Sequence, residues 1–249
     1  MKILILGHSD SIGMALADPS QGWGNRLLAD VEARTGVKPD SLHIRYYPWA
    51  DHDGAYLEKT LAQGPFDAVV IGTTKVAFTI YAAHNRVRRV FGNRAGDWFK
   101  ARVSQFDRKT LWQQEPGAKR SLNQLAHRVG RGVIGQAPDT SMEAVAESYL
   151  RTFARLARLE DTHVVISTAP PLPSDPLRRR PKLEREVERF RLAIREEAKR
   201  RSFTHFDPAT LLPPPGAHRD ALFIDPVHKT AALHAQMAER LASLVVAGS

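Results

Sequence analysis

The sequence predicts a three-layer α/β/α sandwich built on a mostly parallel sheet. Short apolar runs alternate along the chain with longer segments whose apolar residues recur at helical spacing. The connections between them are short, as in successive βαβ units. Because strands joined through helices pair in parallel, this sheet is expected to be buried between two helical layers.

The first part of the chain supplies three strands and two helices of this sandwich. Apolar side chains, among them Trp23, Leu27 and Val31, repeat at helical spacing in the first helix, which Gly36 is expected to cap. The second helix is expected to end near Gly64-Pro65. The expected elements are strands at 2–6, 43–47 and 68–71 and helices at 22–35 and 55–63.

The same rhythm resumes after residue 140. Ser141 is a suitable N-cap for the third helix, with Glu143 in its first turn. The fourth helix carries Glu and Arg at spacings of three and four residues, which is typical of a solvated outer face. The expected elements are helices at 141–159, 182–201 and 230–246 and strands at 163–168 and 204–206.

Residues 79–138 interrupt the pattern and are predicted to form a basic, lid-like insertion in one domain that spans residues 1–249. From 76 to 137 the sequence has 12 Lys and Arg residues and three acidic ones, which accounts for the net charge of +9. A localised positive charge attracts polyanions or anionic substrates, although it is equally typical of a solvated surface. Aromatic residues in this segment favour a small core of its own over a surface for stacking bases.

Composition excludes several kinds of site. The sequence has no cysteine, so disulfides, thiolate metal ligands and a cysteine nucleophile are excluded. Its ten histidines form no His-Glu-x-x-His motif, and residues 7–13 match neither a dinucleotide nor a phosphate loop, so no metal or cofactor is expected. The apolar run at the N-terminus is too short for a signal peptide, and no stretch suits a membrane span, which predicts a cytoplasmic protein.

Two short segments near the ends of the chain carry residues suited to acyl transfer. The first strand runs into Gly7-His8-Ser9, and a tight turn at the carboxyl end of a parallel strand is a good place for a nucleophile. Near the other end, Asp225 precedes His228 by three residues, close enough for a carboxylate to orient an imidazole. Together these segments offer a serine, a base and an acidic partner.

Neither segment is decisive alone, because the same residue types recur nearby. Ser11 lies in the same turn as Ser9 and is the rival nucleophile. Asp40 and His43 repeat the spacing of the C-terminal pair, but they lie at the start of a strand and far from any motif. We therefore interpret His43 as structural.

The two segments resemble the first and last motifs of the GDSL/SGNH hydrolases, and the likeness covers the whole chain. Gly7-His8-Ser9 is similar to the Gly-Asp-Ser of that family, with His8 in place of the Asp. Asp225-Pro226-Val227-His228-Lys229-Thr230 looks like its Asp-Gly-Val-His-Pro-Thr block, which precedes the closing helix. The resemblance implies that Ser9 is the nucleophile, His228 the general base and Asp225 its orienting carboxylate.

The resemblance also implies an oxyanion hole with three donors. The Gly-x-Asn-Asp motif of the family falls on Gly72-Thr73-Thr74-Lys75, so Thr74 replaces its Asn. The other donors are the N–H of Ser9 and that of a glycine after the second strand, for which Gly54 is the candidate. Loss of one such donor typically lowers the rate by about 10²–10³, so a slow enzyme, or one completed by its lid, is expected.

The predicted function is a serine esterase or deacylase that acts through an acyl-enzyme. His8 and Lys75, which depart from the family motifs, are expected either to bind an anionic group of a small-molecule or glycan ester or to form an ion pair with a neighbouring residue. One alternative is an acyltransferase on the same triad, in which a lid excludes water. Another is an inactive protein of this fold whose basic segment binds a polyanion such as nucleic acid.

Overall fold

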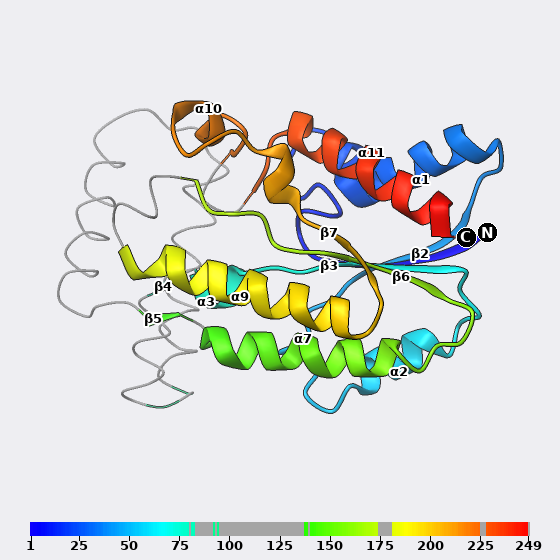
Figure 1. Cartoon of the computed structure of the whole chain (residues 1–249), viewed down its shortest axis with the longest axis horizontal. Coiled ribbons are helices and arrows are strands. Elements are labelled where there is room, and N and C mark those ends of the chain that lie inside the picture. Colours follow the sequence, from blue (N-terminus) through cyan, green and yellow to red (C-terminus); the bar gives the residue numbers. More distant parts are fainter. Residues whose placement is uncertain are drawn as a thin grey trace. The chain divides into compact units, whose positions relative to one another are not determined.

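A parallel sheet forms the centre of the fold (Figure 1). Its five strands lie in the order β2-β1-β3-β6-β7. The computed structural model describes residues 1–79, 140–173, 181–224 and 228–248, together with residues 81–82, 92, 94 and 137–138. The strands are β1 (Lys2–Gly7), β2 (Asp40–Arg45), β3 (Ala68–Gly72), β6 (His163–Ser167) and β7 (Thr204–Phe206).

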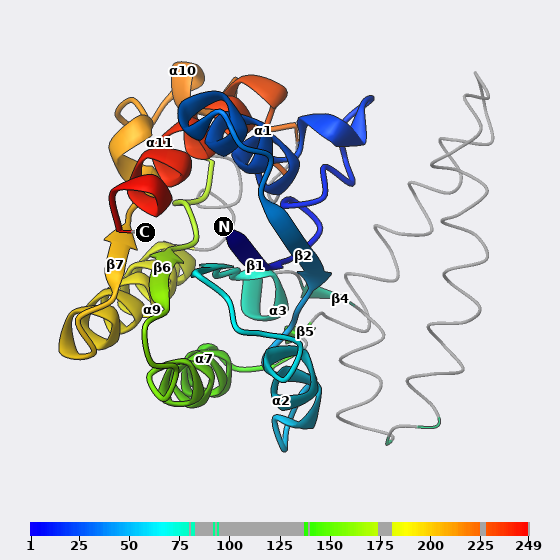
Figure 2. The same ribbon diagram turned by 90° about the vertical axis from the view of Figure 1, so that its right-hand side faces the viewer.

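Helices cover both faces of this sheet, which confirms the predicted three-layer sandwich. One face is covered by α1 (Trp23–Thr35) and α11 (Ala231–Gly248), which pack against each other (Figure 2). The opposite face is covered by α2 (Ala55–Leu61), α7 (Met142–Leu156) and α9 (Pro181–Arg200) (Figure 2). Short helical turns complete the connections: η1 (Pro19–Gln21), η2 (Pro208–Leu211) and α10 (Ala217–Asp220).

The central strands are apolar throughout because both of their faces are covered. Ile3 to Leu6 in β1 and Ala68 to Ile71 in β3 have no solvent exposure, as expected of parallel strands between two helical layers. The edge strand β2 begins at Asp40, three residues earlier than expected, because its backbone pairs with β1 from Lys2 onward. Its first residues are exposed, so their hydrophobic pattern does not mark the strand.

The strand order creates a switch point between β1 and β3. From β1 the chain crosses to β2 on one side, and after β3 it continues through β6 and β7 on the other side. In open parallel sheets, ligands bind outside the carboxyl ends of the strands at such a point. The residues that follow β1 and β3 are therefore the first place to look for a functional site.

The contacts within the chain divide it into two units, one of residues 1–75 with 142–249 and one of residues 76–141. The described part of the second unit contains α3 (Val76–Thr79) and the strands β4 (Tyr81–Ala82) and β5 (Ala137–Pro138). These two strands pair antiparallel, which brings the beginning and end of the segment together. Most of the predicted lid, including its aromatic residues from Phe91 to Trp112 and every Lys and Arg except Arg94, lies outside the described residues.

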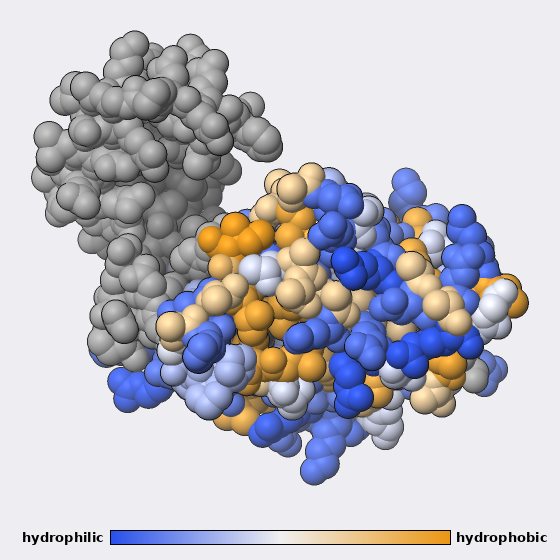
Figure 3. Space-filling view, turned by 90° about the horizontal axis from the view of Figure 1, so that it is seen from above, coloured by the Kyte–Doolittle hydropathy of each residue, from blue (hydrophilic) through white to orange (hydrophobic). Residues whose placement is uncertain are grey.

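The outer face over α1 and α11 carries hydrophobic side chains in patches separated by hydrophilic ones (Figure 3). Beneath it, side chains of both helices form a core with β1 and β3, in which Trp23, Leu27, Leu233 and Leu241 are buried. Within the described ranges, no helix is both long enough and apolar enough to cross a membrane.

Candidate active site

The predicted nucleophile Ser9 lies on a tight turn directly after β1, at the switch point of the sheet. The turn is closed by backbone hydrogen bonds from Ser11 N to His8 O (3.0 Å) and from Met14 N to Ser9 O (3.0 Å). Ser9 is half-buried, and in the described part of the chain neither its hydroxyl nor its N–H makes a hydrogen bond. Both groups are therefore available to a substrate.

Gly7 is required by the close packing beneath this turn. A Cβ added to Gly7 would lie 1.9 Å from Ser11 Oγ, so no other residue fits without moving Ser11. The glycine lets the chain fold back tightly after β1 and brings Ser9 to the carboxyl edge of the sheet. This explains the Gly-x-Ser pattern in physical terms.

The rival nucleophile Ser11 points into the protein and pairs with His43. Its hydroxyl donates to His8 O at 2.8 Å, and its Oγ lies 3.0 Å from Nε2 of His43. Because the hydroxyl hydrogen is used by the carbonyl, His43 Nε2–H donates to Ser11 Oγ. Ser11 has no solvent exposure, and burial lowers the pKa of His43. A serine and a histidine meet here, but the serine hydroxyl has no access to solvent.

The predicted base His228 lies in the loop between α10 and α11. Backbone hydrogen bonds from Ile224 N to His228 O (2.8 Å) and from Thr230 N to Leu222 O (3.0 Å) close this loop, and Phe223 and Lys229 form an antiparallel bridge. His228 is half-buried, like Ser9. Asp225, the predicted orienting carboxylate, lies outside the described residues.

A buried ion pair joins the Ser9 turn to the His228 loop. Lys229 Nζ donates to the carboxylate of Asp10, and each of the two side chains is only 2% exposed. Burial on its own would raise the pKa of Asp10, but the Lys229 ammonium beside it more than offsets burial, and the pKa falls to about 2. Asp10 therefore carries a negative charge under ordinary conditions.

Two buried histidines surround this pair and are neutral at pH 7. Burial lowers the pKa of His8 to about 4, opposed by the Asp10 carboxylate and reinforced by the Lys229 ammonium. Burial lowers the pKa of His234 to about 4 as well, again helped by Lys229. His234 Nδ1 accepts the N–H of Trp23 at 3.1 Å and so caps the first turn of α1 from α11. The charge of His228 also lowers both pKa values, so its ring lies near this cluster.

The predicted oxyanion donors have different surroundings. Thr74 is buried just after β3, and its N–H donates to the Tyr149 hydroxyl at 3.0 Å. Gly54 begins α2 with a left-handed backbone (φ 76°), and its N–H donates to Asp51 O at 3.1 Å. A Cβ at Gly54 would meet the Arg155 guanidinium at 2.2 Å. The structure therefore gives Gly54 a local role at the start of α2, whereas the N–H of Ser9 makes no hydrogen bond to any described residue.

The two predicted substrate contacts, His8 and Lys75, are both buried. Lys75 Nζ donates to Pro170 O in the loop after β6, and its side chain is 3% exposed. Burial, reinforced by the charge of Lys229, holds the pKa of Lys75 well below its ordinary value. Neither side chain presents a positive charge to solvent, so an anionic substrate gains no support from them.

Asp10, Lys229 and His234 complete the cluster, and the sequence reasoning assigned none of them a role. Asp10 follows Ser9 directly and Lys229 follows His228 directly, so two charged residues next to the two motifs were the available signal. Among the described residues, no group of three or more His, Asp or Glu side chains is arranged to hold a metal ion.

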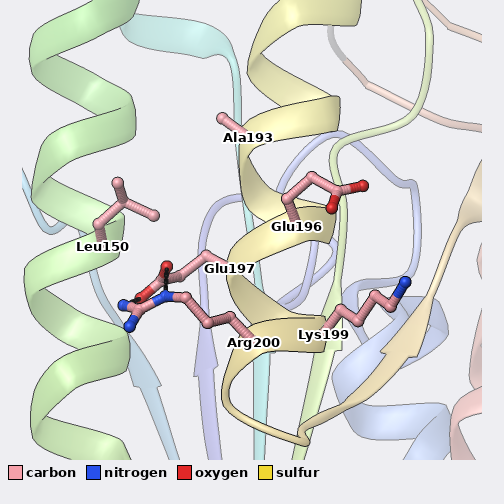
Figure 4. A pocket seen from close by; sticks show the side chains of 6 residues that line it. All are labelled: Leu150, Ala193, Glu196, Glu197, Lys199 and Arg200. Carbon is pink, nitrogen blue, oxygen red and sulfur yellow. Dashed lines mark hydrogen bonds and ion pairs between the residues drawn. The ribbon is translucent and has the colours of Figure 1, made fainter.

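The structure also has a hollow of about 480 Å³ between α7 and α9, away from this edge (Figure 4). It lies near the C-terminal end of α9, which leads into the amino end of β7. Ser9, in contrast, lies at the carboxyl ends of the strands. Glu197 in its wall pairs with Arg200 at 2.5 Å. The lining residues are Leu150, Ala193, Glu196, Glu197, Lys199 and Arg200.

Comparison with solved structures shows that the chain has the fold of the GDSL/SGNH hydrolases. A protein of the G-D-S-L family from Desulfitobacterium hafniense is 11% identical, with a TM-score of 0.53 and 98% of each chain covered. A carbohydrate acetylesterase from Sinorhizobium meliloti is 11% identical, with a TM-score of 0.55 and coverage of 99% of this chain and 98% of that one. An acetylxylan esterase from Geobacillus stearothermophilus is 14% identical, with a TM-score of 0.55 and coverage of 96% and 91%.

At these identities the likeness concerns the fold, which extends over nearly the full length of each chain. No family model and no curated protein sequence matches the chain.

Proposed function

We propose that this protein is a serine ester hydrolase in which Ser9 is the nucleophile and His228 the general base. The observation that carries the proposal is the position of Ser9, which is half-buried at the switch point of the sheet. In the described part of the chain, neither its hydroxyl nor its N–H makes a hydrogen bond. The buried ion pair between Asp10 and Lys229, which joins the Ser9 turn to the His228 loop, supports the same assignment. The fold of known esterases adds to this support.

The proposed reaction proceeds through an acyl-enzyme. His228 takes the hydroxyl proton of Ser9 as Ser9 Oγ attacks the ester carbonyl carbon. The same proton then passes to the leaving alkoxide, and an alcohol departs. Water attacks the acyl-serine with His228 again as base, releasing the carboxylic acid and restoring Ser9. In this proposal Asp225 holds the imidazole and stabilises its charged form.

Stabilisation of the oxyanion is assigned mainly to the N–H of Ser9, with the Thr74 hydroxyl as the second donor. Thr74 follows β3, which pairs directly with β1, so the two residues lie after neighbouring strands at one edge of the sheet. Gly54, the third predicted donor, has its N–H engaged with Asp51. An enzyme whose oxyanion hole has fewer donors than usual is expected to have a low kcat.

The substrate class we propose is a small-molecule or glycan ester. Two solved structures of similar fold are a carbohydrate acetylesterase and an acetylxylan esterase. An anionic substrate stays a prediction, because His8 and Lys75 are buried and the basic segment lies outside the described residues, apart from Arg94. The same site with an alcohol in place of water would make the protein an acyltransferase.

Labelling with a fluorophosphonate probe tests the nucleophile directly. We expect peptide mass spectrometry to locate the phosphonyl group on Ser9 in the parent protein and in Ser11→Ala, and no label in Ser9→Ala. Ser11 is the matched control because it lies in the same turn but is buried. A folded parent protein without label at Ser9 would refute the proposed function.

A further inference from the structure

The two flanking residues Asp10 and Lys229 form a contact that the proposed reaction does not itself use. Asp10 follows the candidate nucleophile and Lys229 follows the candidate base, and they are 219 residues apart in the sequence. Their side chains meet in the interior, where each is only 2% exposed. The hydrogen bond from Lys229 Nζ to the Asp10 carboxylate thus joins the Ser9 turn to the His228 loop.

The direction of the side chains makes this contact relevant to the site. Lys229 lies in a β-bridge with Phe223, and successive side chains on extended backbone point to opposite sides. Lys229 is buried while His228 is half-buried, and Asp10 is buried while Ser9 is half-buried. The two buried residues, Asp10 and Lys229, therefore link the two segments, whereas Ser9 and His228 lie closer to the surface.

Stability alone is a weak reason for such a pair. Desolvation of two charges offsets most of their attraction, and apolar residues of similar size often replace buried ion pairs at no cost in stability. Asp10 Oδ1 also lacks a hydrogen-bond partner among the described residues, so the carboxylate is incompletely satisfied. What an ion pair offers, and two apolar side chains do not, is a directional contact that fixes one loop against the other.

We propose that Asp10 and Lys229 are positioning residues that hold the His228 imidazole at the correct distance and angle from the Ser9 hydroxyl. This inference rests on the proposed function, since it concerns the geometry of the same two residues. A displacement of about 1 Å at reacting groups can lower a rate by roughly 10²-fold. The expected consequence of losing the pair is therefore a lower rate of attack by Ser9 with little change in substrate binding.

The test replaces both charges at once, with Asp10→Leu and Lys229→Met in one chain, so that no unpaired charge stays buried. We expect this double variant to fold, to react with the fluorophosphonate roughly 10²-fold more slowly at Ser9, and to lose kcat on an aryl acetate with KM nearly unchanged. If it does not fold, Asp10→Asn with Lys229→Met, which removes both charges and the hydrogen bond between the two side chains but changes Asp10 less, is measured in the same way.

Arg191→Met is the matched control for loss of stability. Arg191 forms a partly buried ion pair with Asp207 at 2.6 Å, and neither residue belongs to the Ser9 turn or the His228 loop. We expect this variant to have a lower Tm and an unchanged labelling rate per folded molecule.

The outcomes separate the inference from the function on which it rests. A folded double variant that is labelled within about threefold of the parent rate would show that the pair is only structural, while the proposed function stands. A parent protein that carries no label at Ser9 overturns the proposed function and this inference together.

Discussion

The molecule contains two serine–histidine regions that are alike in residue type and different in access. Ser11 and His43 are in contact at 3.0 Å, and His43 follows an Asp by three residues, just as His228 does. Yet Ser11 is wholly buried and its hydroxyl hydrogen is used by His8 O. Ser9, two residues away, is half-buried, and neither its hydroxyl nor its N–H makes a hydrogen bond within the described residues. The comparison teaches that a short contact with a histidine does not by itself indicate a candidate nucleophile. A better indication is a hydroxyl that has access to solvent and whose hydrogen is not already donated to another group of the protein.

The largest expected effect distinguishes the two histidines. His228→Ala is expected to lower kcat on an aryl acetate by roughly 10⁴-fold without loss of fold, because the proton of Ser9 loses its acceptor. His43→Ala is expected to lower the free energy of unfolding by about 1–3 kcal/mol and to leave kcat per folded molecule nearly unchanged. Steady-state kinetics with a urea titration of each variant measure both. The opposite pattern would make Ser11 and His43 the working pair.

A smaller effect on kcat is expected at Thr74, the proposed oxyanion donor. Attack by Ser9 requires this donor, whereas the buried pair of Ser11 and His43 does not. Thr74→Val removes the proposed donor and is expected to lower kcat by about 10²-fold with little change in KM. Thr73→Val is the control, because Thr73 Oγ1 accepts the N–H of Ala169 at 2.9 Å and serves the backbone. Equal kcat values for parent and Thr74→Val would remove Thr74 from the oxyanion hole.

The smallest effect concerns the response of the Ser9 region to acid. His234 has a pKa of about 4 in the fold against 6.5 when unfolded, so the unfolded chain binds its proton first as the pH falls. Its contribution to stability is complete above pH 6.5 and is lost as the pH falls toward 4. Between pH 7 and pH 5 we expect a loss of about 2 kcal/mol from this residue alone.

His234→Gln, which keeps an acceptor for Trp23 N–H but does not titrate, is expected to show a shallower loss over this range. Chemical denaturation of the parent protein and of the variant at each pH provides the measurement. An unchanged slope in His234→Gln would mean that His234 binds its proton equally in the folded and the unfolded chain.

Much of the architecture follows from short-range pattern. The apolar runs of β1 and β3 are continuous because these strands are covered on both faces, and a buried run of this kind is visible in the sequence. The start of β2 is not visible, since an edge strand is held by its backbone pairing to Lys2 onward rather than by apolar side chains. The motif residues Ser9 and His228 were found through their resemblance to a family, and their catalytic roles stay predictions.

The buried cluster could not be predicted, because it depends on contacts between distant residues. Asp10 and Lys229 look like ordinary surface charges until the fold brings them together. Lys75 likewise looks like a contact for an anion, whereas its ammonium is buried against Pro170 O. The sequence shows which residues can carry a charge, but only the fold shows which of them are buried and therefore cannot contact a substrate.

The capping of α1 by His234 has a consequence for the order in which the protein is made. The N–H of Trp23 in the first turn of α1 needs His234 of α11 as its acceptor, and Asp10 in the Ser9 turn needs Lys229 as its partner. Both partners lie more than 200 residues later in the chain. During synthesis the serine therefore leaves the ribosome long before its partners. A chain that stops short of residue 228 carries the proposed nucleophile without its base, so the proposed chemistry begins only after the His228 loop has been made.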